Sequence, residues 1–158
     1  MHYEIERKFL VSGDFTSQIR DSVRITQGYL NSHPERTVRV RIWGEQGFIT
    51  VKGIGSGSGM KRFEWEKEIP VEEARELMDL CEPGVIDKVR HRIPVGDHIF
   101  EVDVFKGENE GLILAEVELK QENEYFRRPE WLGEEVTGDP RYYNAALAKT
   151  PYRKLEVR

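Results

Sequence analysis

The sequence predicts a mostly β protein of the α+β class, an eight-stranded antiparallel β-barrel with a few peripheral helices. Two observations carry this prediction. Eight segments alternate apolar and polar residues with the two-residue period of a strand whose faces differ. The stretches between them are rich in glycine, proline, aspartate and asparagine, which favour tight turns. Strands joined by short turns pair antiparallel.

The elements follow in chain order. Strands are predicted over 2–10, 23–31, 36–43, 47–53, 61–69, 85–93, 98–106 and 112–120. Turns are predicted over 44–47, 94–97 and 107–111. The Gly/Ser run at 53–59 lacks the Gly-Lys-Ser/Thr ending of a phosphate-binding loop and the glycine spacing of a dinucleotide-binding loop. It is interpreted as a flexible hairpin loop.

Three helices are predicted on the outside of the barrel. Residues 71–81 carry apolar side chains at the spacing of one helical face. A short helix over 14–21 would be capped by Asp14. The third covers 141–149, with Pro140 in its first turn and Pro151 after its end.

Length and composition limit the classes of function that the chain can have. The 158 residues fit one domain, 1–158, and 34% of them are charged. No apolar run approaches the ~20 residues that cross a bilayer, and the start lacks the apolar core of a secretion signal. We therefore expect a cytoplasmic protein without membrane contact. A net charge of −5 argues against nucleic acid as the partner.

Seven predicted strands have one apolar face and one densely charged face. The charged faces carry Glu4, Glu6 and Lys8; Arg39 and Arg41; Lys52; Arg62, Glu64, Glu66 and Glu68; Lys88, Arg90 and Arg92; Glu101 and Asp103; and Glu116, Glu118 and Lys120. An open sheet with solvated charges is the ordinary explanation. The alternative is an inward charged face, because an eight-stranded barrel can hold one small ligand and arginine forks suit phosphate. Burying so many ions requires water, mutual pairing or a charged ligand.

Short motifs then occur in an order that resembles one known family. They are Glu4-Ile5-Glu6-Arg7-Lys8, Thr37-Val38-Arg39-Val40-Arg41, Thr50-Val51-Lys52-Gly53, Lys88-Val89-Arg90, Glu101-Val102-Asp103 and Ala115-Glu116-Val117-Glu118-Leu119. Over about residues 2–150 the chain resembles the CYTH superfamily, the triphosphate tunnel metalloenzymes. Its carboxy-terminal motifs at 131–137 and 142–147 resemble the short bacterial inorganic triphosphatases.

The resemblance implies a tunnel-forming barrel with a charged interior and assigns roles by matching position. Catalysis is implied for Lys8, Glu6 and Glu118. The implied metal ligands are Glu4, Glu6, Glu116 and Glu118, with Asp103 assisting. The implied phosphate-binding residues are Lys8, Arg39, Arg41, Lys52, Lys88 and Arg90. Arg62, Glu64, Glu66, Arg92 and Glu101 share the inward face by parity, without a firm role.

Other residues keep two interpretations. Tyr29 is either a phosphate or water contact or a packing residue, and Lys149 either reaches a tunnel mouth or complements a helix carboxy terminus. The histidines show no metal-binding spacing and are interpreted as surface or structural residues: His2, His33, His91 and His98.

The function implied by the resemblance is metal-dependent hydrolysis of inorganic tripolyphosphate to pyrophosphate and phosphate, with Mg²⁺ or Mn²⁺. A class IV adenylate cyclase, another organic triphosphatase and a non-catalytic polyphosphate-binding module are the alternatives. The sequence leaves open the physiological substrate, the metal and its number, a homodimer, and the group that activates water.

Overall fold

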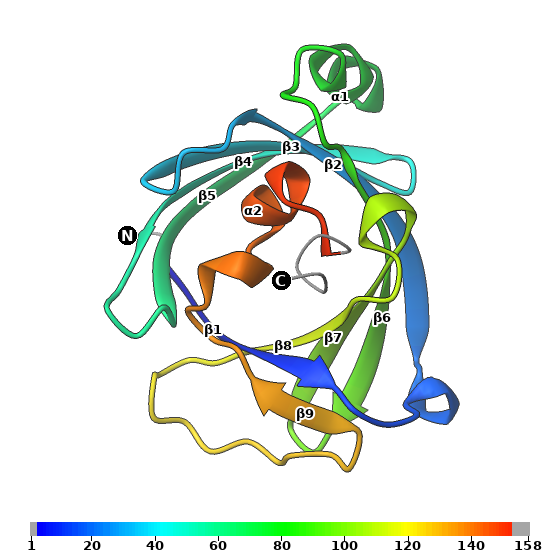
Figure 1. Ribbon diagram of the computed structural model, residues 1–158, viewed down its shortest axis with the longest axis vertical. Coiled ribbons are helices and arrows are strands. Elements are labelled where there is room, and N and C mark those ends of the chain that lie inside the picture. The colour runs from blue at the N-terminus through cyan, green and yellow to red at the C-terminus, as the bar shows by residue number, and fades with distance from the viewer. Residues whose placement is uncertain (1–2, 153–158) are drawn as a thin grey trace.

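The computed structural model describes residues 3–152, which form a closed antiparallel β-barrel (Figure 1). Eight strands run around it in the order β5-β4-β3-β2-β6-β7-β8-β1, and pairing of β1 with β5 closes the ring. Their bounds are β1 Tyr3–Val11, β2 Asp21–Asn31, β3 Arg36–Trp43, β4 Gln46–Gly55, β5 Lys61–Ile69, β6 Ile86–Val95, β7 His98–Phe105 and β8 Ile113–Glu118. All eight predicted strands are confirmed, with ends that differ by two residues or fewer.

A ninth strand, β9 Leu132–Glu135, was not predicted. It pairs with the second half of β1, where Phe9 lies opposite Glu135 and Val11 opposite Leu132. The first half of β1 pairs with β5 instead. A strand of four residues is too short to show alternation, so the sequence pattern could not reveal it.

The apolar core lies mostly on the outer side of the barrel. Phe9, Phe100 and Val117, on neighbouring strands, pack beneath Phe126 and Trp131 of the segment that follows β8. A second apolar cluster lies at one end of the barrel. Its buried members are Ile86, Phe105, Leu112, Leu114, Val136 and Leu147. The barrel interior is thereby left to polar side chains.

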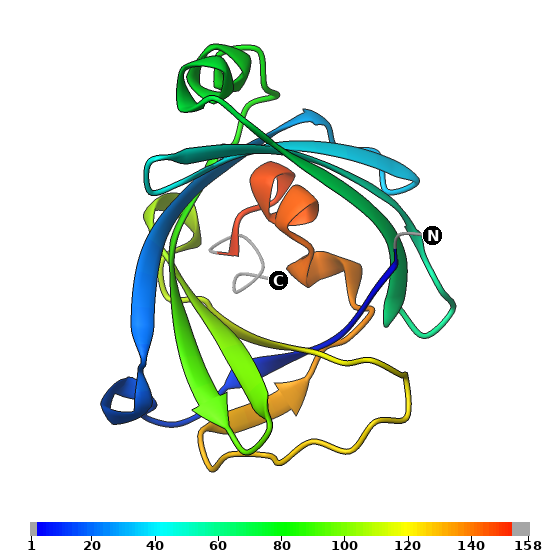
Figure 2. The same cartoon turned by 180° about the vertical axis from the view of Figure 1, so that it is seen from behind.

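The predicted helix over 71–81 is present as α1 Val71–Met78, on the outside of the barrel against β2, β3 and β4 (Figures 1 and 2). Two glycines let it approach closely. A Cβ on Gly28 would lie 2.9 Å from the Cβ of Cys81, and one on Gly47 would lie 2.7 Å from the Cβ of Ala74. These close contacts, one with Ala74 of α1 and one with Cys81 just after it, hold α1 on the sheet.

The other two helix predictions are only partly right. Only a 3₁₀ turn, η1 Thr16–Gln18, forms near Asp14, whose carboxylate accepts a hydrogen bond from the Thr16 amide at 2.9 Å. A second such turn, η2 Gly107–Asn109, follows β7. The predicted helix over 141–149 is split into η3 Pro140–Tyr142 and α2 Asn144–Lys149.

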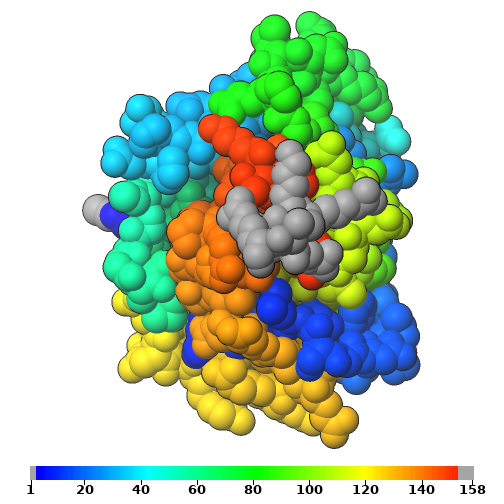
Figure 3. All heavy atoms as spheres, viewed as in Figure 1, coloured from blue at the N-terminus to red at the C-terminus, as the bar shows by residue number. Residues whose placement is uncertain are grey.

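The position of α2 differs from the predicted outside location. It lies across one end of the ring of strands, where η3 and α2 (orange to red) are at the surface in Figure 3. Leu147 is fully buried there against Ile86 and Leu114. This end of the barrel is apolar, so covering it buries apolar surface that would otherwise face water. None of the helices within residues 3–152 is long and apolar enough to cross a membrane.

Candidate active site

The charged strand faces point inward and enclose a cavity of about 550 Å³. Lys8, Arg39, Arg41 and Arg90 are each no more than 8% exposed. Most of the residues singled out from the sequence line this cavity: Glu4, Glu6, Lys8, Tyr29, Arg39, Arg41, Lys52, Arg62, Glu64, Glu66, Arg90, Glu101, Glu116, Glu118 and Lys149. The barrel is therefore polar inside and apolar outside, and the open-sheet alternative is excluded.

One side of the cavity is a basic wall, formed by Arg39 and Arg41 of β3 and Arg90 of β6. The Arg41 Nε donates to Gln27 Oε1 at 3.0 Å. Arg39 donates through one terminal nitrogen to the Thr50 hydroxyl at 3.2 Å, but its buried Nε has no hydrogen-bond partner. A buried donor without an acceptor is costly, so it indicates a place for an anionic ligand.

Arg39 pairs with Glu66 at 3.6 Å and Arg90 pairs with Glu101 at 3.5 Å, whereas Arg41 has no carboxylate within 4 Å among the described residues. Burial, followed by the charges of Arg39 and Arg90, lowers the pKa of Arg41 to about 9. Asp103 is the one buried carboxylate against this wall within residues 3–152, and it binds Arg90 through two hydrogen bonds of 2.7 and 2.9 Å. An anion in the cavity would relieve the remaining repulsion.

The opposite side is an acidic wall, formed by Glu4 and Glu6 of β1, Glu64 of β5, and Glu116 and Glu118 of β8. These strands are neighbours, and β-pairing places Glu6 directly opposite Glu118. Lysines neutralise part of the wall: Lys52 Nζ lies 2.6 Å from Glu4 and 3.5 Å from Glu64, and Lys8 Nζ lies 3.8 Å from Glu116.

The pKa values show how closely the acidic wall is crowded. Burial, then the charges of Glu116 and Glu4, raises the pKa of Glu6 well above its usual value. Burial also acts on Glu4, but the Lys52 charge and hydrogen bonds from Glu64 and Lys52 outweigh it and bring that pKa to about 2. Burial and a hydrogen bond with Glu4 raise the pKa of Glu64 to about 7. The wall thus retains protons near neutral pH.

These carboxylates fit a divalent cation that arrives with phosphate. Within residues 3–152 no three acidic, histidine or cysteine side chains form a ready metal site. Mg²⁺, however, is commonly held by one or two carboxylates, with waters and substrate phosphate oxygens completing its shell. Burial and the neighbouring charges of Glu116 and Glu4 raise the pKa of Glu6 and so favour a proton on this carboxyl. A cation could replace that proton.

Three predicted residues are not part of the cavity lining. Lys88 is fully buried, and its Nζ contacts Asp103 at 2.7 Å and Asn144 Oδ1 at 3.1 Å. Both oxygens of Asp103 are engaged by Arg90 and Lys88. This geometry favours Asp103 as an anchor for the basic wall over the metal-binding role predicted for it.

Arg92 is the third of these residues. Its position in β6 has the parity of Lys88 and Arg90, as predicted. Its side chain, however, pairs with Asp21 at 2.7 Å and is 42% exposed. Parity gives the face of a strand but not the depth of a side chain along the barrel, which explains the difference.

The end of the barrel that α2 covers also contributes cavity-lining residues for which the sequence predicts no role. Tyr143, between η3 and α2, lies with its ring 5.5 Å from the Lys8 Nζ and 5.5 Å from the Arg62 guanidinium carbon. Gly59 of the Gly/Ser hairpin and Gly138 also line the cavity, and a Cβ on Gly59 would lie 2.3 Å from the Gly138 Cα. The hairpin is therefore part of the cavity wall in addition to being a turn.

No histidine lines the cavity among the described residues. His91 contacts the Ser22 hydroxyl, and His98 contacts Glu124. His33 accepts a hydrogen bond from the Glu35 amide through its ring, and His2 lies outside the described residues. The predicted structural role therefore fits the three described histidines.

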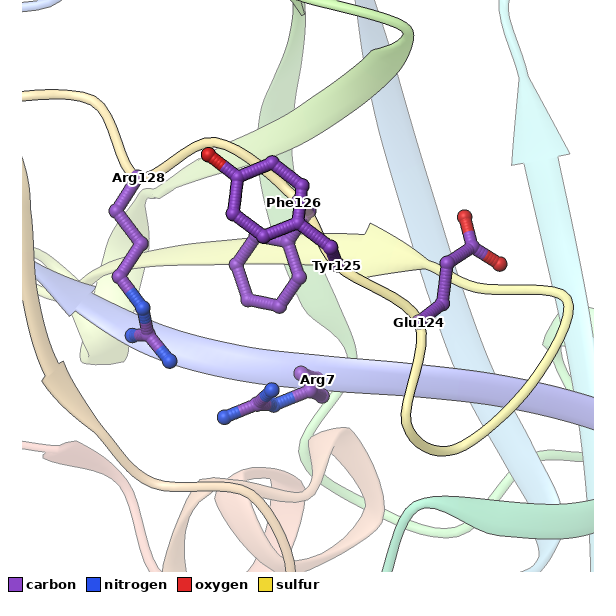
Figure 4. A pocket seen from close by; sticks show the side chains of 5 residues that line it. All are labelled: Arg7, Glu124, Tyr125, Phe126 and Arg128. Atoms are coloured by element: carbon purple, nitrogen blue, oxygen red, sulfur yellow. The ribbon is translucent and has the colours of Figure 1, made fainter.

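A second hollow, of about 280 Å³, lies on the outer surface of the barrel (Figure 4). It is lined by Arg7, Glu124, Tyr125, Phe126 and Arg128. Arg7 is paired there with Glu135, and the guanidinium groups of Arg7 and Arg128 lie about 5 Å from the Phe126 ring centre. This hollow contains none of the inward charged residues and is separate from the candidate active site.

Comparison with known proteins agrees with this fold and cavity. Residues 2–143 match the CYTH domain family, and the chain belongs to that family. It is 47% identical to an inorganic triphosphatase of Acetivibrio thermocellus over 157 residues, covering 99% of each chain. It is 40% identical to an inorganic triphosphatase of Nitrosomonas europaea, covering 92% of this chain and 96% of the relative.

A solved structure of an inorganic triphosphatase superimposes with a TM-score of 0.66 at 37% identity. The alignment covers 91% of this chain and 96% of that one. The predicted family and barrel are confirmed by these matches and by the fold.

Proposed function

We propose that this protein hydrolyses inorganic triphosphate to pyrophosphate and phosphate with a divalent cation, Mg²⁺ or Mn²⁺. The observation that carries the proposal is the division of one cavity into a basic wall, where Arg41 has no carboxylate partner among the described residues, and an acidic wall, where Glu4 and Glu116 crowd Glu6. A triphosphate with its cation brings an anion to the first wall and a cation to the second. The names of the full-length relatives support the same activity.

Phosphoryl transfer depends mainly on positioning and charge neutralisation. One group of residues binds the phosphates, and another binds the cation. Arg39, Arg41 and Arg90 bind phosphate oxygens from one side, and Lys8 and Lys52 bind from the side of the acidic wall. Glu4, Glu6, Glu116 and Glu118 hold the cation. When bound, the cation neutralises charge that develops on the phosphate oxygens.

The reaction is an in-line attack of water on the terminal phosphorus. A bond forms between the water oxygen and phosphorus, and the bridging P–O bond breaks. Pyrophosphate leaves with that electron pair, and the proton of the water passes to solvent. The basic wall keeps the chain of phosphates aligned while this happens.

The test is phosphate release from inorganic triphosphate, ATP and pyrophosphate, with Mg²⁺, Mn²⁺ or EDTA. We expect fast metal-dependent release from triphosphate, much slower release from ATP, and loss of turnover in Glu118→Ala at an unchanged thermal midpoint. Glu108→Ala, an exposed glutamate of η2, is the matched control. Cyclic AMP formation from ATP would favour a cyclase, and tight binding without release would favour a binding module.

A further inference from the structure

Trp43 stands out among the residues that line the cavity, because it is a large aromatic side chain in a charged interior. It is the last residue of β3 and is half-buried. Lys149 of α2 lies 3.9 Å from Glu82, which bonds to Ser32 just before β3. α2 therefore covers the end of the barrel at which β3 begins, and Trp43 lies toward the other end.

Two members of the basic wall contact this ring. The guanidinium carbon of Arg41 lies 5.7 Å from the ring centre, and that of Arg90 lies 5.6 Å from it. These distances are within the range of cation–π attraction, which is strongest for tryptophan and for desolvated cations. Both arginines are at most 7% exposed, so water screens the attraction little.

Each arginine is already held from a second direction. Gln27 accepts from the Nε of Arg41, and Asp103 accepts from Arg90. The Gln27 amide is neutral and leaves the charge of Arg41 unpaired, and the charges of Arg39 and Arg90 repel it. The electron-rich face of Trp43 offsets that repulsion and gives both guanidinium groups a common support.

We propose that Trp43 is a positioning residue, whose ring holds Arg41 and Arg90 in the orientation that binds triphosphate. This inference rests on the proposed function. Because two guanidinium groups contact the ring, Trp43 acts through the arginines and does not serve as a stacking surface for a nucleobase.

The experiment compares wild type with Trp43→Leu and Trp43→Phe. Leucine keeps apolar volume but removes the aromatic face, whereas phenylalanine keeps a face. Trp65→Leu is the matched control, because Trp65 lies on the other face of β5 from Glu64 and Glu66 and is 40% exposed. Inorganic triphosphate affinity is measured by calorimetry in EDTA, and KM and kcat are measured with Mg²⁺.

We expect Trp43→Leu to weaken triphosphate affinity and raise KM roughly tenfold, with kcat changed less than about threefold. Trp43→Phe should restore most of the affinity, and Trp65→Leu should match wild type. Equal losses in Trp43→Phe and Trp43→Leu, or a loss confined to ATP, would overturn the proposal.

A second measurement covers the outcome that Trp43→Leu fails to fold. Wild type and Trp43→Phe are produced with fluorinated tryptophan, which weakens the negative charge of the ring face with little change of shape. KM should rise with fluorination in wild type and stay constant in Trp43→Phe; a constant KM in both contradicts the proposal. If wild type releases no phosphate, the proposed function fails, whereas the calorimetric comparison still tests the role of Trp43.

Discussion

The basic and acidic walls of the cavity manage buried charge in different ways. The arginines of the basic wall contact neutral partners, namely Gln27, Thr50 and the Trp43 ring, and three carboxylates, Asp103, Glu66 and Glu101. The carboxylates of the acidic wall pair with two lysines or keep a proton, as the raised pKa of Glu6 shows.

This difference follows from the chemistry of the two groups. Arginine does not lose its proton in a protein, so a cluster of arginines needs an outside anion. A glutamate can take up a proton and give it back, so a cluster of glutamates stays tolerable until a cation arrives. In the metal-free cavity a proton relieves repulsion on the acidic side, whereas the charge of Arg41 on the basic side remains repelled by Arg39 and Arg90.

The largest effect should come from the acidic wall. Glu6→Gln keeps the shape of the protonated carboxyl but cannot become a carboxylate ligand, so turnover of triphosphate should fall by on the order of a hundredfold or more. The thermal midpoint of the metal-free protein should stay the same or rise, because a crowded carboxyl is removed. Glu108→Gln, on the exposed η2 turn, is the control. A folded Glu6→Gln variant with normal turnover would remove Glu6 from the site.

A smaller effect is expected from the basic wall. Arg39→Met removes the buried Nε that has no partner, so KM for triphosphate should rise roughly ten- to a hundredfold, the loss expected for a charge-assisted hydrogen bond. Steady-state kinetics measure it. Arg36→Met, in the same strand but exposed, should leave KM unchanged. An unchanged KM in Arg39→Met would mean that the unpartnered donor does not face the substrate.

The affinity of the acidic wall for Mg²⁺ should increase moderately with pH. Because the pKa of Glu6 is raised, a cation must displace its proton, and Mg²⁺ affinity should therefore increase with pH until Glu6 is ionised. Calorimetric titrations at pH 6, 7 and 8 measure this. Affinity that stays constant or falls with pH would contradict the raised pKa of Glu6.

The same raised pKa has a consequence for stability. A carboxyl whose folded pKa lies above its unfolded value contributes stability at low pH and loses it as pH rises through the folded pKa. The metal-free wild type should therefore lose thermal midpoint with rising pH relative to Glu6→Gln. Scanning calorimetry of both proteins over pH 5 to 8 measures the difference, and parallel curves would count against it.

The smallest effect is expected at Arg92, which shares the parity of the basic wall but lies outside the cavity and pairs with Asp21. Arg92→Ala should change KM and kcat less than about twofold. The same kinetic assay checks it. A large rise in KM would show that the cavity extends farther along β6 than the geometry indicates.

The alternation of residues predicted most of the barrel and most of the cavity lining, because a period of two determines which face each side chain occupies. It could not predict how far along the barrel each side chain lies, so it does not distinguish Arg92, Lys88 and Asp103 from the residues that line the cavity. It gave no role to Trp43, which shares the parity of Arg39 and Arg41 but is uncharged, or to Gln27, whose contact with Arg41 joins two strands. The position of α2 across one end of the barrel depends on the packing of Leu147 against the apolar cluster at that end. This contact joins residues far apart in the sequence, so the local alternation of residues does not predict it.

The proposed function requires the two walls to be complementary to a complex of triphosphate and cation. Its most direct test is calorimetric titration of Mn²⁺ with and without a non-hydrolysable triphosphate, and of that triphosphate with and without Mn²⁺. We expect each ligand to tighten the binding of the other at least tenfold and by the same factor, as linkage requires. Independent binding of the two ligands, or binding of one that weakens the other, would contradict it.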